Sequence, residues 1–303
     1  MEGQAAFIAV DWGTTNARFW LCDRDGGVLA EAGGLGVAAL RIDRKFAEEF
    51  AKATSGWPEN VPAVLCGTIG ANIGWHQVGY RALPASLDEL SQNTLHFVEG
   101  RRPIAILAGV SGKGSFGQLD LMRGEDIQLA GVIADGHGDG IYVLPGTHNK
   151  WVQVRDRAIV SFHTAMTGEL YAAIAGNTIL LTSAATPPLV GEAFNNGAKL
   201  ALSHADAGLA SLLFTVRTRQ VLGEMSEADA ASYLSGVMIG ADVAGGAAQF
   251  GEATRSAPIT LVGGSSLAAS YARACELAGI ATSAIAGDAA VLRGLTLAFR
   301  QLF

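Results

Sequence analysis

The stretch Phe7-Ile8-Ala9-Val10-Asp11-Trp12-Gly13-Thr14-Thr15 runs from an apolar segment directly into a glycine turn. The apolar part is short, contains β-branched residues and ends at a glycine, so it predicts a buried strand that feeds a tight loop. Gly13 has no Cβ to keep a phosphate group away from the backbone, and Thr14 and Thr15 add hydroxyl donors. Asp11 lies at the strand end, where it can hold a hydrated Mg²⁺ that shares substrate phosphates. The stretch therefore predicts a phosphate-binding turn with a metal ligand.

Two further turns of the same kind occur later in the chain, Leu144-Pro145-Gly146-Thr147-His148 and Leu261-Val262-Gly263-Gly264-Ser265-Ser266. A single turn of this kind is most often an ordinary β-turn, because Gly, Asp and Thr are common turn residues. Three of them, each after an apolar strand, are spread too widely for one βαβ unit to contain them. Together they predict a nucleotide phosphate site.

Length and composition favour a soluble protein of two domains. A chain of 303 residues is at or just beyond the size at which single cores tend to split. Half of the residues are apolar, only 16% are charged, and the net charge is −7. No run of Lys or Arg is longer than two residues, so we expect no nucleic-acid partner.

Cysteine usage and the N-terminus indicate the cytoplasm. The three cysteines, Cys22, Cys66 and Cys275, are widely separated and lack Cys-x-x-Cys spacing, which predicts neither a disulfide framework nor a zinc site. Strand signals begin by Phe7, so we expect no secretory peptide. The uncharged stretch from Leu170 to Gly191 is interrupted by Gly, Asn, Thr and Pro, which predicts a buried helix and loop and no membrane span.

The order of strands and turns predicts a duplicated fold. Residues 17–30 read as a hairpin with an acidic glycine turn, following the first phosphate turn. Residues 141–162 repeat this strand and turn order around the second phosphate turn. The flexible residues 135–140 mark a boundary, so we expect an N-terminal lobe at 1–138 and a C-terminal lobe at 139–303. We expect the last helix to pack back toward the N-terminal lobe.

Local sequence patterns predict two helices, one strand and one loop elsewhere in the chain. Arg44 to Thr54 has apolar residues at helical spacing, and Ser226 begins a long helix that runs to about Phe250. Ile104 to Val110 predicts one strand, followed by a Gly/Ser-rich mobile loop from Ser111 to Gly117.

Three motifs, Asp11-Trp12-Gly13-Thr14-Thr15-Asn16, Gly124-Glu125-Asp126 and Gly263-Gly264-Ser265-Ser266, resemble the actin/hexokinase/Hsp70 nucleotide-binding superfamily. More closely, the chain resembles the 2-dehydro-3-deoxygalactonokinases over nearly its whole length. The segments that carry this resemblance are Val10 to Arg18, Gly67 to Trp75, Met122 to Gln128, Leu144 to Val152, Met166 to Leu170 and Leu234 to Ala241. The resemblance implies an α/β fold of two ribonuclease-H-like, actin-like ATPase lobes. Each lobe would have a mixed sheet flanked by helices, with an ATP cleft between the lobes.

Glu125 and Asp126 are the candidate catalytic bases. Phosphoryl transfer requires a metal-bound triphosphate, donors over the γ-phosphate and an acceptor for the proton of the attacking hydroxyl. Neighbouring helical residues point about 100° apart, so only one of the two should be the base. Glu125 follows Gly124 as the acid does in related carbohydrate kinases, which slightly favours it. The family usually has two glutamates and a threonine where this chain has Glu125, Asp126 and Ile127, so both candidates stay open. Both could instead merely satisfy the helix N-terminus.

The resemblance also implies the ligand contacts, with ATP and Mg²⁺ as cofactors and Asp11 as the metal ligand. The residues expected to bind the cofactors are Asp11, Gly13, Thr14, Thr15, Gly146, Thr147, Lys150, Gly263, Gly264, Ser265, Ser266 and Gly287. A sugar acid carries a carboxylate and hydroxyls, which favour a guanidinium and amides. The residues expected to contact it are Asn16, Arg18, Asn72, Trp75 and Glu169.

Several of these residues have a simpler alternative. Arg18 could pair with an acidic residue of the following turn, Asp23 or Asp25. Lys150 could be a surface lysine, and Glu169 could cap a helix. Strand alternation places His148 and Lys150 on one face and Asn149 on the other. Arg123, just before a predicted helix, is expected to be solvated.

The resemblance implies an enzyme, an ATP-dependent sugar-acid kinase that makes the 6-phosphate of 2-dehydro-3-deoxy-D-galactonate in galactonate catabolism. Its expected partners are the sugar acid and ATP, with no nucleic acid and no membrane, and the apolar composition leaves room for a homodimer. An alternative substrate is the epimeric 2-dehydro-3-deoxy-gluconate or another sugar acid. A second alternative is a non-catalytic, nucleotide-gated regulator that binds a sugar.

Overall fold

The computed structural model describes residues 4–114, 116–181 and 187–303. The chain forms two compact units. Unit 1 contains Met1–Asp139, Val154–Ser161 and Gly287–Phe303, and unit 2 contains Gly140–Gln153 and Phe162–Ala286. Among the described helices, none is long and apolar enough to cross a membrane.

Unit 1 is built on a six-stranded sheet in the order β3-β2-β1-β4-β8-β7. Its central strands β1, β4 and β8 are parallel, whereas β2, β3 and β7 run antiparallel to their neighbours. The strands are β1 (Phe7–Trp12), β2 (Asn16–Cys22), β3 (Val28–Leu35), β4 (Ala63–Cys66), β7 (Leu95–Glu99) and β8 (Arg102–Ile106). The first apolar run is thus a buried strand, as predicted, and the hairpin after it is confirmed.

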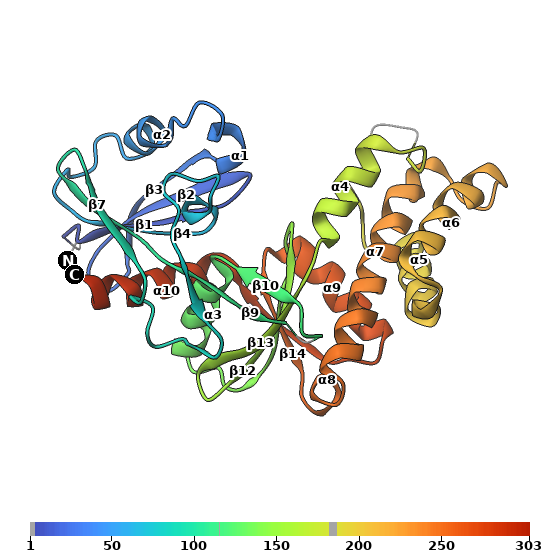
Figure 1. Cartoon of the computed structure of the whole chain (residues 1–303). Coiled ribbons are helices and arrows are strands. Elements are labelled where there is room, and N and C mark those ends of the chain that lie inside the picture. Colours follow the sequence, from blue (N-terminus) through green and yellow to red (C-terminus); the bar gives the residue numbers. More distant parts are fainter. Residues whose placement is uncertain (1–3, 115, 182–186) are drawn as a thin grey trace. The chain divides into compact units, whose positions relative to one another are not determined.

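Helices cover this sheet. Alternate residues of β1, including Ile8, Val10 and Trp12, belong to a core that also contains Phe46 and Phe50 of α2 (Phe46–Ala53). Phe7 points to the opposite face of β1. Its ring stacks on Phe299 of α10 (Gly287–Leu302), with ring centroids 4.3 Å apart. Helix α10 also packs closely on α3 (Glu125–Ala134), because Gly131 and Gly294 let each helix approach the other's backbone (Figure 1). A short helix α1 spans Val37–Leu40.

A second six-stranded sheet has the order β15-β14-β11-β12-β13-β6, with β11, β14 and β15 parallel. Its strands are β6 (Ala85–Ser86), β11 (Gly140–Leu144), β12 (Asn149–Arg155), β13 (Ala158–Ala165), β14 (Ile259–Gly263) and β15 (Thr282–Ala286). A three-stranded sheet joins β5 (Tyr80–Ala82), β9 (Gly109–Lys113) and β10 (Leu119–Met122). The α/β class with mixed sheets flanked by helices is confirmed.

The helices of unit 2 gather around one long helix, α7, whose first turn is capped by Ser226 as predicted. Gly197 and Gly236 allow α5 and α7 to touch, since a Cβ at either position would meet a carbonyl of the other helix. The helices are α4 (Thr167–Asn177), α5 (Glu192–Ser203), α6 (Leu209–Val221), α7 (Glu227–Phe250), α8 (Ala253–Ser256) and α9 (Ser265–Leu277) (Figure 1).

Two expectations about secondary structure are wrong. Residues 104–110 do not form one strand, because the chain leaves β8 after Ile106 and enters β9 of a different sheet at Gly109. Residues 111–113 belong to that second strand, so the expected loop is partly strand.

The predicted buried helix after Leu170 is mostly exposed, since Thr167 is the buried residue among those described in α4. Residues 182–186 of the same stretch lie outside the described residues.

Candidate active site

Asp11 lies at the end of β1 and is paired with Arg18 on the antiparallel strand β2. Arg18 Nη2 donates to Asp11 Oδ2 at 2.6 Å, and Arg18 Nη1 pairs with Asp288 at the start of α10. The expected alternatives for Arg18 are wrong, because Asp25 pairs with an arginine of α10 and Asp23 accepts backbone N–H groups of its own turn. Arg18 therefore bridges two carboxylates in unit 1.

The first glycine turn presents polar groups at the end of β1. Gly13 N donates to Asn16 O at 2.9 Å and closes the turn. Thr14, Thr15 and Asn16 are exposed, and Thr14 Oγ1 lies 3.1 Å from Thr68 Oγ1 in the loop after β4. The turn thus has the exposed hydroxyls that an anion requires.

Cys66, on β4, lies beside the candidate metal ligand. Its Sγ donates to Asp11 Oδ1 at 3.9 Å. Burial raises the pKa of the Cys66 thiol well above its usual range, and the charges of Asp11, Asp126 and Glu125 raise it further. Asp11 therefore faces a buried thiol of the neighbouring strand.

Two glycines lie where the start of α3 approaches the ends of β1 and β4. Gly67, directly after β4, has φ +91°, and a Cβ there would lie 2.7 Å from Trp12 O. Gly124 has φ +106°, and its Cβ would lie 3.2 Å from the Cα of Gly67. Positive φ favours glycine, so these residues let the start of α3 approach the ends of β1 and β4.

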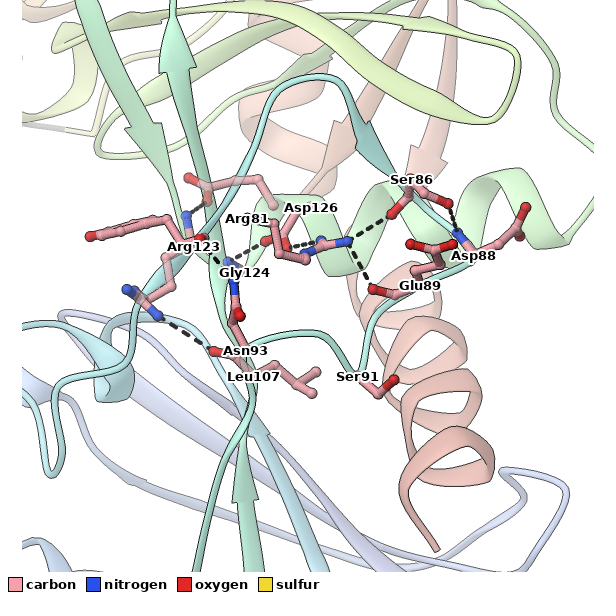
Figure 2. Close-up of polar contacts among 12 residues, drawn as sticks. Arg81, Ser86, Asp88, Glu89, Ser91, Asn93, Leu107, Arg123, Gly124 and Asp126 are labelled. Atoms are coloured by element: carbon pink, nitrogen blue, oxygen red, sulfur yellow. Dashed lines mark hydrogen bonds and ion pairs between the residues drawn. The ribbon is translucent and has the colours of Figure 1, made fainter.

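Asp126 is an internal ion-pair partner. Its carboxylate is wholly buried, and Arg81 Nη2 donates to its Oδ2 at 2.8 Å (Figure 2). Gly124 N donates to its Oδ1 at 3.0 Å. Arg81 is itself buried and also donates to the carbonyls of Ser86 and Glu89 at 2.7 and 3.3 Å. Asp126 thus joins α3 to Arg81 of β5, and Arg81 in turn holds the segment that follows β5.

Glu125 has different surroundings from its neighbour. It is half-buried, and its Oε2 accepts a hydrogen bond from Arg123 N at 3.0 Å. The expectation of a solvated Arg123 is wrong, because its guanidinium donates to Val78 O at 2.7 Å. It also donates to Leu107 O at 3.4 Å (Figure 2). The same guanidinium lies 4.4 Å from the ring centroid of Tyr80. Glu125 is therefore held just beyond an anchored arginine.

The second glycine turn, in unit 2, contacts the start of α4. Glu169 N donates to Thr147 O at 3.0 Å, and a Cβ on Gly168 would lie 2.5 Å from Gly146 O. The side chain of Glu169 pairs with Nε2 of His148, and both side chains are about half exposed. The turn and the first residues of α4 therefore form one packed segment.

Asn149 and Lys150 follow the expected alternation, because Asn149 and Trp151 contact Asp242 whereas Lys150 between them contacts Thr164. His148 precedes β12, and Lys150 and Asn149 are both buried. Lys150 Nζ donates to Thr164 Oγ1 at 2.8 Å, so the surface-lysine alternative is wrong.

Asp242 is a polar residue of unit 2 that the sequence analysis missed. It lies on α7, is only 9% exposed, and its carboxylate accepts four hydrogen bonds. Oδ1 accepts from Trp151 Nε1 at 2.9 Å, and Oδ2 accepts from Asn149 Nδ2 at 2.9 Å, Thr167 Oγ1 at 2.6 Å and Tyr271 Oη at 2.5 Å. A usable signal was present, because Asp242 is the single charged residue between Ala230 and Phe250.

The third glycine turn opens α9 and lies near a small cavity. Gly264 is the N-cap of α9, and Gly264, Ser265 and Ser266 are exposed. A mainly apolar cavity of about 100 Å³ is lined by residues of α4, α7, α9, the second turn and the segment before α5: Gly146, Thr167, Gly168, Tyr171, Pro188, Ser235, Met238, Ile239, Leu267 and Tyr271. A larger cavity of about 520 Å³ involves Arg219, Glu224 and Asp229, away from every candidate residue.

The remaining candidates, Asn72, Trp75 and Gly287, differ in how exposed they are. Asn72 is exposed in the loop after β4, whereas Trp75 is a core residue whose ring contacts Trp12 and Phe97 edge-on. The indole of Trp75 therefore packs in the core of unit 1. Gly287 is buried at the first position of α10.

Sequence and structure comparisons identify the relatives of this chain. Residues 11–298 match the family model described as 2-keto-3-deoxy-galactonokinase. The chain belongs to this family. It is 36% identical to "Probable 2-dehydro-3-deoxygalactonokinase DgoK1" of Rhizobium meliloti, over 98% of this chain and 97% of the relative. It is 33% identical to 2-dehydro-3-deoxygalactonokinase of Escherichia coli, over 96% of each chain. The crystal structure of "a putative 2-dehydro-3-deoxygalactonokinase protein from Sinorhizobium meliloti" is 35% identical, with a TM-score of 0.87, over 98% of this chain and 99% of that chain.

A more distant comparison concerns the fold. The activator of 2-hydroxyisocaproyl-CoA dehydratase from Clostridium difficile, solved with bound ADPNP, is 10% identical with a TM-score of 0.51, covering 98% of this chain and 95% of that one. The predicted family, the actin-like ATPase and sugar-kinase fold, and the assignment as a sugar-acid kinase are confirmed. Membership of this kinase family also supports the use of ATP.

Proposed function

We propose that this kinase transfers the γ-phosphoryl group of ATP to the 6-hydroxyl of 2-dehydro-3-deoxy-D-galactonate. Both curated relatives are named for a kinase of this sugar acid. The observation that carries the proposal is the close approach of the start of α3 to the strand ends that hold Asp11: a Cβ on Gly124, directly before Glu125, would lie 3.2 Å from Gly67 Cα, and the neighbouring Cys66 Sγ lies 3.9 Å from Asp11 Oδ1. Phosphoryl transfer depends on positioning and electrostatic stabilisation, for which a metal ligand beside a base is suited.

Glu125 is our proposed base. A base must be within hydrogen-bond reach of the substrate hydroxyl. The carboxylate of Asp126 is wholly buried and bonded through both oxygens, to Arg81 and Gly124 N. Glu125 is the more exposed of the two and lies next to the glycine that approaches β4. This arrangement supports Glu125 as the base and Asp126 as a structural anion.

Mg²⁺ fits the donor set at the end of β1. The described residues hold no cluster of three His, Cys, Asp or Glu side chains that could bind a metal. A single carboxylate, Asp11, is enough for Mg²⁺, because this ion keeps several waters and binds through one or two carboxylates plus substrate phosphates. Asp11 would hold the hydrated ion, which would neutralise charge on the phosphates. Arg18 would then share or yield Asp11 Oδ2.

The glycine turns and the small cavity are our proposed nucleotide contacts. Thr14, Thr15, Gly146 and Thr147 offer hydroxyl and backbone donors to phosphates. The cavity beside Gly146 has two tyrosines and a methionine in its lining, which suits the apolar faces of a purine. The exposed Gly264, Ser265 and Ser266 would lie against the ribose.

The sugar acid is assigned to exposed polar groups of unit 1. Asn16 and Asn72 are exposed amides, and Arg18 is a cation that contacts Asp11 directly, with its Nη2 2.6 Å from Asp11 Oδ2. We place the reaction in the cytoplasm, which the three free thiols support. A homodimer remains part of this proposal, to be checked by sedimentation.

A coupled ADP-release assay tests the proposed function. The panel contains 2-dehydro-3-deoxygalactonate, its gluconate-derived epimer and simple hexoses. We expect the highest kcat/KM for the galactonate-derived acid, and a higher value for its epimer would establish the alternative substrate. Absence of turnover with every acid, combined with intact ATP binding, would instead support a non-catalytic regulator.

A further inference from the structure

The carboxylate of Asp242 is a buried anion whose recorded partners, within the described part of unit 2, are all uncharged donors. Burying an ionised carboxylate is costly unless it is well hydrogen-bonded. Here four donors from three separate segments meet two oxygen atoms. Such a group specifies one arrangement of those segments, because moving any of them leaves a buried donor or the anion without a partner.

The four donors belong to the elements next to the second and third glycine turns. Asn149 and Trp151 begin the strand β12, which leaves the second turn. Thr167 is the first residue of α4, and the next residue, Gly168, packs against Gly146 O. Tyr271 lies on α9, which leaves the third turn. Asp242 therefore joins both turns to the long helix α7.

Two of the donors also line the small cavity. Thr167 and Tyr271 are among its lining residues, together with Gly146 and Leu267. Burial raises the pKa of Tyr271 well above its usual range, and the charge of Asp242 raises it further, so the phenol stays a donor. The cavity wall thus has the shape that the hydrogen bonds to Asp242 impose.

We propose that Asp242 is a positioning residue for the nucleotide, acting through Asn149, Thr167 and Tyr271. This inference rests on the proposed role of the two turns and the cavity in binding ATP. A carboxylate is required because an amide offers one acceptor oxygen and would turn its NH₂ group toward a donor. Asp242→Asn therefore places two donors face to face while preserving the volume of the side chain.

The test measures ATP-analogue binding by calorimetry, together with the KM for ATP and for the sugar acid. Losing a hydrogen bond to a charged group predicts a rise of about 10- to 100-fold in the dissociation constant for ATP in Asp242→Asn. The KM for the sugar acid should stay within about threefold, since none of the donors belongs to its assigned residues. Asp229→Asn is the matched control, because it makes the same change at an exposed position of α7.

Trp151→Phe provides a second variant if Asp242→Asn does not fold. It removes the donor to Oδ1, and Trp151 does not line the cavity, so a several-fold loss of ATP affinity would act through Asp242. Combining Trp151→Phe with Asp242→Asn should recover part of the lost affinity, because it removes a donor that faces the new amide. Folded variants that all bind ATP as wild type does would overturn this inference alone. A wild-type chain that binds no nucleotide would overturn the proposed function.

Discussion

At the start of α3, two neighbouring carboxylates have different surroundings. Asp126 is enclosed with Arg81, whereas Glu125 is half-buried and bonded to the backbone of Arg123. Removing one partner of a buried ion pair typically destabilises a protein by about 3–5 kcal/mol, because it leaves an uncompensated charge. Removing a general base instead lowers the rate by about 10²- to 10⁴-fold. Substituting Asp126 should therefore mainly lower stability, whereas substituting Glu125 should mainly lower the reaction rate.

We expect Glu125→Gln to lower kcat by about 10²- to 10⁴-fold, with a melting temperature close to that of the wild type. Asp126→Asn should lower the free energy of unfolding by a few kcal/mol, while the folded fraction keeps most of its kcat. Single-turnover kinetics and thermal unfolding on the same samples would separate these effects. The opposite pattern, a stable but inactive Asp126→Asn, would make Asp126 the base.

At the scale of elements, Gly146 and Gly168 serve the second turn in different ways. A Cβ on Gly146 would meet no protein atom within 4 Å, whereas one on Gly168 would meet the turn's own backbone. Gly146→Ala should therefore keep the stability of the wild type and raise the KM for ATP, since the methyl would intrude on a bound phosphate. Gly168→Ala should also lower stability, by about 1–3 kcal/mol.

Thermal unfolding and ATP titration of both glycine variants would check this contrast. Gly138→Ala is a suitable control, because its added Cβ also meets nothing within 4 Å and Gly138 is not among the candidate residues. Unchanged ATP affinity in Gly146→Ala would remove the second turn from the phosphate site.

The elements also show what sequence patterns can predict. β1, the hairpin after it and the capped start of α7 follow local rules, since apolar runs, glycine turns and an N-cap serine act over a few residues. The split between β8 and β9 was missed because the apolar run from Ile104 continues through the point where the chain changes sheets. The roles of Trp75 and Asp242 depend on partners distant in sequence, which no local pattern gives.

At the scale of the whole molecule, buried thiols predict how stability depends on alkaline pH. Burial raises the pKa of Cys22 and Cys275 from 9.0 to about 12, and raises that of Cys66 well above 9.0. The unfolded chain loses these protons first, so the stabilisation is present below about pH 9 and is lost as the pH rises toward about 12.

Each such group lowers the free energy of unfolding by about 1.4 kcal/mol per pH unit within that range. Urea unfolding between about pH 8 and 11, on either side of the ordinary value of 9.0, would measure the slope. The slope should become shallower in Cys275→Ala, and a flat profile would contradict the prediction.

The two compact units predict a selective effect of ATP on thermal unfolding. Both later glycine turns, the small cavity and Asp242 belong to unit 2, whereas Asp11 and Glu125 belong to unit 1. Multidomain chains often depart from two-state unfolding, so we expect two calorimetric transitions. ATP with Mg²⁺ at 100 times its dissociation constant should stabilise the chain by about 2.7 kcal/mol. Because most of the proposed nucleotide contacts belong to unit 2, that gain should appear, without sugar acid, mainly in the transition that Gly168→Ala lowers, and EDTA should reduce it. An equal shift of both transitions would show that Asp11, Thr14 and Thr15 of unit 1 contribute as much to ATP binding as the contacts of unit 2.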